Sequence, residues 1–334
     1  MSIEDKILKL KQVTNAITHN PLLDCFEQDE LKIIDNSALL DKFIADKKKK
    51  IFSLIDKLNI DFDSKLKSAF DEYIEAMTYL RLKAKFDNVE RIKESNDKTP
   101  DFKIEFNQDF NNTFSNYCVY AELKTMSFAQ ANNNYIYAMN QGLNSNIEIE
   151  KQLKNGRKVA FGLTEIQPLY NSNKDYDPYS VKYAIEILIE KIEQNIKEGQ
   201  FSKGETVLII DLKQLILPSD FKEGGVPVSI ENQYHSLVSG VHWNVAFGKI
   251  GYPIYRQVEF EGRENIEGEL SKNGILISRD WIKAICFVDY EGKKPKITGF
   301  YRHIGLSNEI EYFLHKFCEF VNDDVNSNGW EIFK

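Results

Sequence analysis

The sequence predicts an α/β protein whose central mixed β-sheet is flanked by helices, and three observations lead to this prediction. Residues 64–85 repeat apolar side chains at spacings of three and four, which is typical of an amphipathic helix. Three short segments rich in β-formers follow at 88–93, 100–106 and 116–126. Helical and strand-like segments then alternate as far as residue 212, as expected for an α/β core.

Further segments extend this pattern on both sides of the core. Residues 3–58 repeat apolar side chains at helical spacing without strand-like alternation, so we expect a helical N-terminal section. Residues 107–116, which are rich in Asn and Asp, are expected to connect the second and third strands. The other expected helices are 145–153, 179–197 and 309–321, and the other expected strands are 158–164, 206–212, 243–247, 281–290 and 296–302.

Proline and glycine divide the chain after the core. The segment 218–227 contains Pro218, Gly224, Gly225 and Pro227, a composition that favours a junction between folded parts. The three expected parts are a helical section at 1–60, a core at 61–217 and a C-terminal α+β extension of the core sheet at 218–334.

The composition is that of an ordinary folded protein. The chain has 334 residues, of which 42% are apolar and 28% are charged. It contains no run of about 18 apolar residues, and the charged start MSIEDKILKLKQ lacks the apolar region of a signal peptide. We therefore expect a cytoplasmic protein without a membrane partner.

Charge, cysteine spacing and missing motifs exclude several classes of protein. The formal net charge of -8 argues against nucleic-acid binding over the whole surface, while a local basic groove stays compatible with it. The four cysteines lie far apart and form no CxxC pair, so neither a disulfide framework nor a zinc site is expected. The absence of GxxxxGK[ST], GxGxxG and GxSxG motifs argues against nucleotide-driven, dinucleotide-dependent and serine-hydrolase chemistry.

One group of charged residues fits a catalytic metal site. On the expected strand 116–126, side chains alternate between faces, so Glu122 and Lys124 point the same way. Asp101 begins the preceding strand, and pairing of the two strands would bring it beside Glu122. Two carboxylates form an all-oxygen site that suits Mg²⁺ or Mn²⁺. Lys124 could then hold or deprotonate an attacking water, which is the chemistry of phosphodiester hydrolysis.

These residues resemble the signature of the PD-(D/E)xK nuclease superfamily, which has the restriction-endonuclease-like fold. Pro100 and Asp101 match the PD of that signature, and Glu122 with Lys124 matches its ExK. The order of expected elements over residues 64–212 is also similar to that of the superfamily. The resemblance is to bacterial members in general, so it implies a reaction type and a restriction-endonuclease-like core, and it does not imply a target.

The resemblance implies two further ligands. A helix before the first strand often adds a glutamate to the metal site of such nucleases, and Glu75 in FDEYIEAMTYL is the matching position, with Glu72 as the second choice. The backbone carbonyl of the middle ExK residue, here Leu123, commonly joins the metal coordination in the family. Catalytic roles are thus expected for Asp101, Glu122, Lys124 and Glu75.

The function expected from this resemblance is that of a metal-dependent endonuclease. Its substrate would be nucleic acid, with DNA expected before RNA, and its cofactor would be Mg²⁺ or Mn²⁺. Cleavage of both strands would favour a homodimer. The competing hypothesis is a nuclease-fold binding module that is catalytically silent or is activated by a protein partner or small effector.

Several other signals stay open or favour a structural role. Gln141, Gln152 and Gln167 follow the motif, where related nucleases sometimes use a glutamine to steady the lysine or the substrate, and the sequence does not choose among them. His235 and His242 are seven residues apart, which matches no standard ligand motif. The positions interpreted as solvated or packed are Lys47–Lys50, Lys154, Arg157, Lys158, Tyr135 and Tyr137.

Overall fold

The chain forms two compact units in the computed structural model. One unit comprises Met1–Glu72, Ser127–Pro178 and Leu215–Leu217, and the other comprises Tyr73–Met126, Tyr179–Gln214 and Pro218–Lys334. The structure describes residues 2–13, 21–56, 62–93, 99–110, 113–126, 145–162, 181–213, 241–255, 266–291 and 294–324.

The first unit is mainly helical in the residues that the structure describes. In its first helix the buried side chains of Ile3, Ile7 and Leu10 have the spacing of four and three that the sequence pattern predicts. Residues 145–154 also form a helix in this unit, which confirms the expected helix at 145–153. The other elements are α1 (Ile3–Val13), the 3-10 helix η1 (Pro21–Cys25), α2 (Gln28–Ser37), α3 (Lys42–Asp56) and the first part of α4 (Phe62–Lys85).

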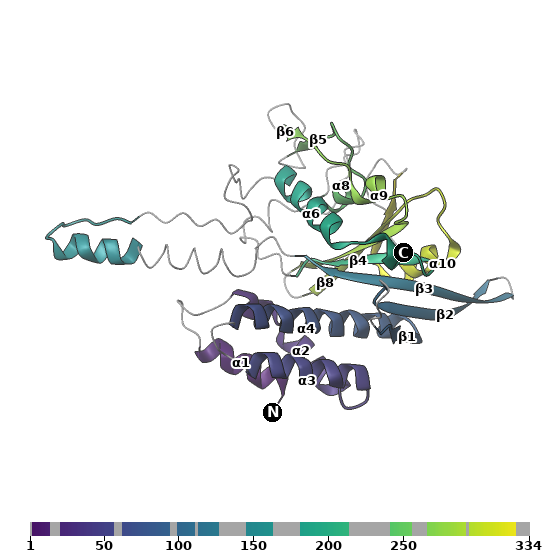
Figure 1. Cartoon of the computed structure of the whole chain (residues 1–334), viewed down its shortest axis with the longest axis horizontal. Coiled ribbons are helices and arrows are strands. Elements are labelled where there is room, and N and C mark those ends of the chain that lie inside the picture. Colours follow the sequence, from purple (N-terminus) through teal and green to yellow (C-terminus); the bar gives the residue numbers. More distant parts are fainter. Residues whose placement is uncertain are drawn as a thin grey trace. The chain divides into compact units, whose positions relative to one another are not determined.

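A mixed seven-stranded sheet forms the centre of the second unit, with the order β1-β2-β3-β4-β7-β8-β9 (Figure 1). Strands β3, β4 and β7 run parallel, as do β8 and β9, and the remaining pairs are antiparallel. The strands are β1 (Asn88–Arg91), β2 (Phe102–Phe110), β3 (Thr113–Thr125), β4 (Thr206–Asp211), β7 (Ala284–Glu291), β8 (Lys294–Tyr301) and β9 (Phe320–Asp323).

Helices and short elements complete the second unit. With the mixed sheet described above, these helices confirm the predicted fold class, an α/β protein whose central mixed sheet is flanked by helices. No helix among the described residues is both long enough and apolar enough to cross a membrane. The elements beside the sheet are α6 (Val181–Asn195), η2 (Glu198–Phe201), α8 (Val241–Phe247), α9 (Ile275–Ser278), α10 (Asn308–Phe317) and a ribbon of β5 (Pro253–Tyr255) and β6 (Ile266–Glu269).

The strand register assigns the side chains of the sheet to two faces. Phe102 of β2 lies opposite Ala121 of β3, so both point to the same face. Tyr79 of α4 contacts the Phe102 ring with 6.3 Å between the centroids, and α4 therefore covers this face. On the opposite face, His242 of α8 stacks on Phe287 at 4.8 Å. In Figure 1, α4 lies on one side of the sheet and α6, α8 and α9 lie on the other.

The expected loop at 107–116 is wrong in extent. β2 continues to Phe110 and β3 begins at Thr113, with pairing maintained up to Phe110 opposite Thr113. The polar composition of the segment favoured a turn, but the two strands satisfy each other's backbone groups, and this pairing outweighs the weak local preference of Asn and Asp.

Two expected strands are also wrong. Residues 158–162 are irregular, Val159 and Phe161 are exposed, and no strand in the described part of the chain pairs with this segment. Residues 243–247 belong to helix α8, whose seven residues are all buried. A short apolar run does not distinguish a buried helix from a buried strand, and its tertiary surroundings decided in favour of the helix.

The last expected helix ends early. α10 ends at Phe317, and Cys318 adopts an extended conformation with φ -93° and ψ 152°. The chain then forms β9, which pairs in parallel with β8. Among the other predicted features, segment 218–227, Tyr135, Tyr137, Gln141, Gln167 and His235 lie outside the described residues.

A buried polar cluster lies at the end of β4, on the α4 face. Tyr290 donates its hydroxyl hydrogen to Asp211 Oδ2 at 2.9 Å, and Arg81 Nη1 lies 3.8 Å from the same oxygen. The backbone N–H of Lys213 donates to Asp211 Oδ1 at 2.9 Å. Burial raises the pKa of Asp211, while Arg81 and these hydrogen bonds oppose the rise. The cluster joins helix α4 to the central strands.

Candidate metal and catalytic site

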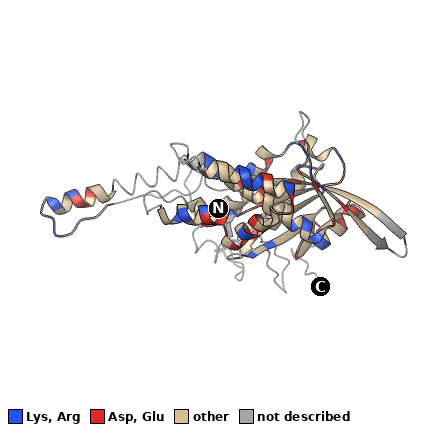
Figure 2. Ribbon diagram, turned by 90° about the horizontal axis from the view of Figure 1, so that it is seen from below, with Lys and Arg blue, Asp and Glu red and all other residues tan. Residues whose placement is uncertain are grey.

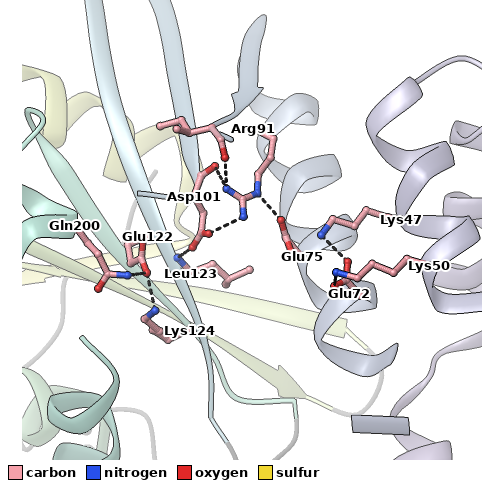
Figure 3. Close-up of polar contacts among 11 residues, drawn as sticks. Lys47, Lys50, Glu72, Glu75, Arg91, Asp101, Glu122, Leu123, Lys124 and Gln200 are labelled. Carbon is pink, nitrogen blue, oxygen red and sulfur yellow. Dashed lines mark hydrogen bonds and ion pairs between the residues drawn. The ribbon is translucent and has the colours of Figure 1, made fainter. Parts of the chain in front are cut away.

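Pairing of β2 with β3 brings Asp101 beside Glu122. The paired register begins at Phe102 opposite Ala121, so Asp101, which directly precedes it, lies beside the β3 segment that carries Glu122, and its charge acts on Glu122. The backbone N–H of Asp101 donates to the carbonyl of Ala121 at 3.0 Å. The backbone N–H of Leu123 donates to Asp101 Oδ2 at 2.8 Å (Figure 3). These bonds fix the Asp101 carboxylate against the β3 backbone.

Glu122 is the most buried member of the site, with 1% of its surface exposed. Its Oε1 accepts hydrogen bonds from Lys124 Nζ at 2.6 Å and from Gln200 Nε2. Its Oε2 is buried, and no group among the described residues donates to it. Burying a carboxylate oxygen without a partner costs about 1–3 kcal/mol or more. The Oε2 atom therefore has acceptor capacity that the described residues do not use.

The two carboxylates hold their protons more tightly than isolated side chains do. Burial, followed by the negative charge of Asp101, raises the pKa of Glu122 to about 7, and Lys124 opposes this rise. The pKa of Asp101 is also raised, mainly by burial, with Arg91 and the Leu123 N–H opposing and Glu75 adding to the rise. A divalent cation would favour the ionised form of both groups, which is the arrangement expected of an oxygen-ligand site.

Arg91 of β1 connects the predicted Glu75 to this pair. Arg91 Nε donates to Glu75 Oε1 at 2.5 Å, and Arg91 Nη2 lies 3.1 Å from Asp101 Oδ1. Arg91 Nη1 donates to the backbone carbonyls of Ile92 and, at 3.0 Å, Asp101. Figure 3 shows the guanidinium between the two carboxylates. Nothing in the segment NVERIK singled out Arg91, because only the pairing of β1 with β2 places it next to Asp101.

The structure does not gather all the predicted ligands at one point. Helix α4, which carries Glu75, covers the face of Phe102, whereas Glu122 and Lys124 point to the opposite face. In the described part of the chain, no three His, Cys, Asp or Glu side chains lie close enough to hold one metal ion. Asp101, Glu122 and Lys124 are thus brought together, and Glu75 is linked to them through Arg91.

Glu72, the second choice on the same helix, has other partners. Its carboxylate pairs with Lys47 at 2.6 Å and with Lys50, both from α3. Burial raises the pKa of Glu72, but these two lysines outweigh that effect and lower it. Two members of the lysine run 47–50 thus serve an internal ion-pair cluster, and the solvated interpretation is wrong for Lys47, whose side chain is 12% exposed.

Gln200 is the glutamine that contacts the site, and the sequence analysis missed it. Its Oε1 accepts the backbone N–H of Lys197 at 2.9 Å, which leaves its Nε2 to donate to Glu122. Of the three glutamines considered from the sequence, Gln152 lies in the first unit, where it bonds the backbone of Phe161. Gln200 lies in η2, and the parallel pairing of β3 with β4 brings η2 to Glu122.

Replacing Gln200 by methionine is expected to weaken the ionised form of Glu122. The amide donates to the carboxylate, so its loss should raise the pKa of Glu122 further, by up to about one unit for a bond worth about 1 kcal/mol. The midpoint of Glu122 ionisation, measured by NMR titration of its carboxyl carbon, should move to higher pH accordingly. Gln194→Met is the matched control, because Gln194 makes an exposed amide-to-carboxylate bond to Glu190. An equal shift in both variants would contradict this role.

The remaining candidates have structural surroundings. Lys154 is exposed and pairs with Glu150 at 3.5 Å, as expected for a solvated face. His242 is fully buried, and burial lowers its pKa. The four cysteines are free, and only the buried Cys286 and Cys318 approach each other, with their Sγ atoms 3.5 Å apart.

The fold and the site together define a mixed α/β protein in which a buried glutamate, a partly exposed aspartate, a lysine and a glutamine meet beside β3. Comparisons with protein-family models, with curated proteins and with solved structures found no match for this chain. The function is therefore inferred from the geometry and chemistry of these residues.

Proposed function

We propose that the protein is a metal-dependent nuclease of the PD-(D/E)xK type, hydrolysing phosphodiester bonds with DNA as the expected substrate. The observation that supports this most is the juxtaposition of Asp101, Glu122 and Lys124 across β2 and β3. The buried Glu122 Oε2, which no described residue satisfies, supports a ligand at this point. An isolated strand ion pair on a solvated face would have neither a second carboxylate nor such burial.

The residues present suit a hard divalent cation such as Mg²⁺ or Mn²⁺. Asp101 and Glu122 would hold it with oxygen ligands, and the Leu123 carbonyl is the expected third donor. When bound, the ion would polarise the scissile phosphate and offset its negative charge. Because its signature residues resemble those of the PD-(D/E)xK superfamily, we also propose that the core of this protein is restriction-endonuclease-like.

Lys124 would act on the attacking water or on the charge that develops at the phosphate. Its Nζ lies 2.6 Å from Glu122 Oε1, so the ammonium is held beside the proposed cation site. Gln200 donates a hydrogen bond to the same oxygen. Oε1 would thus be held by Lys124 and Gln200, and Oε2 would be left to bind the cation. Asp101 is held by the Leu123 N–H, which keeps the two carboxylates aligned across the strands.

The charge distribution fits local substrate contacts better than binding over the whole surface. Figure 2 shows Lys and Arg mixed with Asp and Glu along the same helices and strands. With a formal net charge of -8, phosphate binding over the whole surface is disfavoured. Substrate affinity is therefore expected to depend on the cation and on a few local contacts.

The test is cleavage of plasmid DNA, single-stranded DNA and RNA by the full chain with Mg²⁺, Mn²⁺ or EDTA. We expect cleavage only with the metals, and Asp101→Asn should reduce it at least about 100-fold, since it removes a proposed metal ligand. Asp87→Asn is the control, because Asp87 is exposed just before β1. Equal activity in EDTA, or full activity in Asp101→Asn, would rule out the proposed chemistry.

A second candidate is a nuclease-fold binding module that is silent, or that needs a partner for activity. The specific observation in its favour is that each carboxylate already has a cation from the same chain: Arg91 for Glu75 and Asp101, and Lys124 for Glu122. A silent module would gain no stability from Mn²⁺, whereas a metal site should be stabilised by its ligand. A partner-activated enzyme would bind Mn²⁺ but cut nothing alone.

A further inference from the structure

The position of Arg91 bears on how many cations the site can take. Its guanidinium lies between Glu75 and Asp101, where the helix glutamate and the strand aspartate would otherwise face each other. A cation between two carboxylates relieves their repulsion, and here the protein supplies that cation itself. A divalent ion placed between the same two groups would meet both the bulk and the positive charge of Arg91.

Arg91 is held in this place by more than the two carboxylates. Its Nη1 donates to the backbone carbonyls of Ile92 and Asp101, which β-sheet pairing fixes. Its guanidinium carbon lies 5.8 Å from the centroid of the Phe102 ring. Because Nε, Nη1 and Nη2 all have acceptors, releasing Arg91 to admit a metal ion would break several charge-assisted hydrogen bonds.

The two sides of Asp101 therefore differ in what they offer a metal. On the Arg91 side, Asp101 Oδ1 and Glu75 Oε1 are both engaged by the guanidinium. On the Glu122 side, Oε2 is buried without a donor among the described residues. The five charged side chains, which are three carboxylates and two cations, sum to one negative charge. This balance suits one divalent ion better than two.

We propose that the site binds a single divalent cation, on the Glu122 side of Asp101, and that Arg91 takes the place of a second cation between Glu75 and Asp101. This inference rests on the proposed metal-dependent function. It makes Glu75 a positioning residue, which holds Arg91, in place of the metal ligand expected from the sequence. Hydrolysis would then use one bound ion together with the fixed charges of Lys124 and Arg91.

The test is the stoichiometry of Mn²⁺ binding to the full chain at pH 8, measured by calorimetry and checked by counting bound Mn²⁺ with electron paramagnetic resonance. The wild type should bind one Mn²⁺ per chain. Glu75→Gln, which keeps an acceptor for Arg91, should also bind one, with its Kd changed by less than about threefold. Glu122→Gln should weaken binding more than about 100-fold, beyond the loss that outer-shell changes cause.

Arg91→Met provides the complementary result. Without the guanidinium, Glu75 and Asp101 can share an ion, so this variant should bind two Mn²⁺ per chain if circular dichroism shows that it is folded. Arg279→Met is its control, because Arg279 forms an ion pair of 3.1 Å with Glu193 that includes none of the five charged residues of the site. This variant should still bind one Mn²⁺ per chain.

The outcomes separate this inference from the proposed function. Two Mn²⁺ in the wild type, falling to one in Glu75→Gln, would overturn the role of Arg91 and leave a metal-dependent nuclease intact. A loss of affinity in Glu75→Gln as large as that expected for Glu122→Gln, more than about 100-fold, would also overturn the role of Arg91, by making Glu75 a ligand. No Mn²⁺ bound to the folded wild type would overturn both. Because Glu75→Gln preserves the hydrogen bond to Arg91, the test does not depend on whether Arg91→Met folds.

Discussion

Replacing Lys124 by methionine is expected to reduce metal-dependent cleavage by about 10²–10⁴-fold, the range that a positioned proton-transfer or charge-stabilising group contributes. Methionine keeps much of the apolar stem of lysine but has no ammonium beside Glu122. The affinity for Mn²⁺ should change much less than the rate, because Lys124 is not a proposed ligand. Single-turnover cleavage of a labelled duplex, with Mn²⁺ binding measured in parallel, separates the two effects.

The chain provides a closely matched control for this variant. Lys103 and Glu105 of β2 form an ion pair of 2.5 Å with the same two-residue spacing as Lys124 and Glu122. This pair is more exposed, so Lys103→Met is expected to change the cleavage rate by less than about threefold. If the two lysine variants lose the same activity, the effect is one of general charge or stability, and the catalytic role of Lys124 is contradicted.

Replacing Glu122 by glutamine is expected to stabilise the metal-free protein at pH 8. The folded protein raises the pKa of Glu122 from 4.5 to about 7, so the ionised carboxylate is disfavoured on folding. At about 1.4 kcal/mol per pH unit, the cost reaches about 3 kcal/mol above pH 7. Glutamine does not ionise, and it should therefore raise the free energy of unfolding by an amount of this order.

The pH dependence of this effect gives it a definite sign. A carboxyl group with a raised folded-state pKa loses its stabilising contribution as the pH rises from about 4.5 through about 7. The difference between Glu122→Gln and the wild type should therefore be small near pH 4.5 and largest above pH 7. Urea unfolding at both pH values measures it. If Glu122→Gln raises the free energy of unfolding equally at both pH values, ionisation of Glu122 is not the cause of the gain.

Metal should remove most of this difference in stability. At 100 times its Kd, Mn²⁺ is expected to stabilise the wild type by about 2.7 kcal/mol and to leave Glu122→Gln unchanged. Glu105→Gln is the control, since its side chain is 40% exposed and the change should alter stability by less than about 0.5 kcal/mol at either pH. Stabilisation of Glu122→Gln by Mn²⁺ equal to that of the wild type would place the metal elsewhere.

Local sequence patterns predicted most of the helices and strands of the fold. The helix at 64–85 and the strands around Asp101, Glu122 and residues 206–212 follow from hydrophobic periodicity and β-forming composition, and the structure has α4, β2, β3 and β4 at these places. Alternation along one strand also sufficed to put Glu122 and Lys124 on one face. These predictions hold because each depends on residues that are neighbours in the sequence.

The errors arose where partners distant in sequence decide the structure. The apolar run 243–247 forms a buried helix, and the alternating apolar segment 158–162 pairs with none of the strands that the structure describes. Most of the polar segment 107–116 belongs to β2 and β3, which pair with each other up to Phe110 and Thr113. In each case the local preference is weak, on the order of 1 kcal/mol or less, and tertiary packing or pairing outweighs it.

The sequence alone determined which residue types could form the carboxylate and lysine site of Asp101, Glu122 and Lys124, since their spacing sets the direction of each side chain. Only the tertiary structure decided what surrounds them. It brought Gln200 to Glu122 and placed Arg91 between Asp101 and Glu75. These contacts depend on the pairing of β1 with β2 and of β3 with β4, and on the packing of α4 on one face of the sheet. Pairing and packing are long-range consequences of backbone hydrogen bonding and burial. No local sequence pattern encodes them.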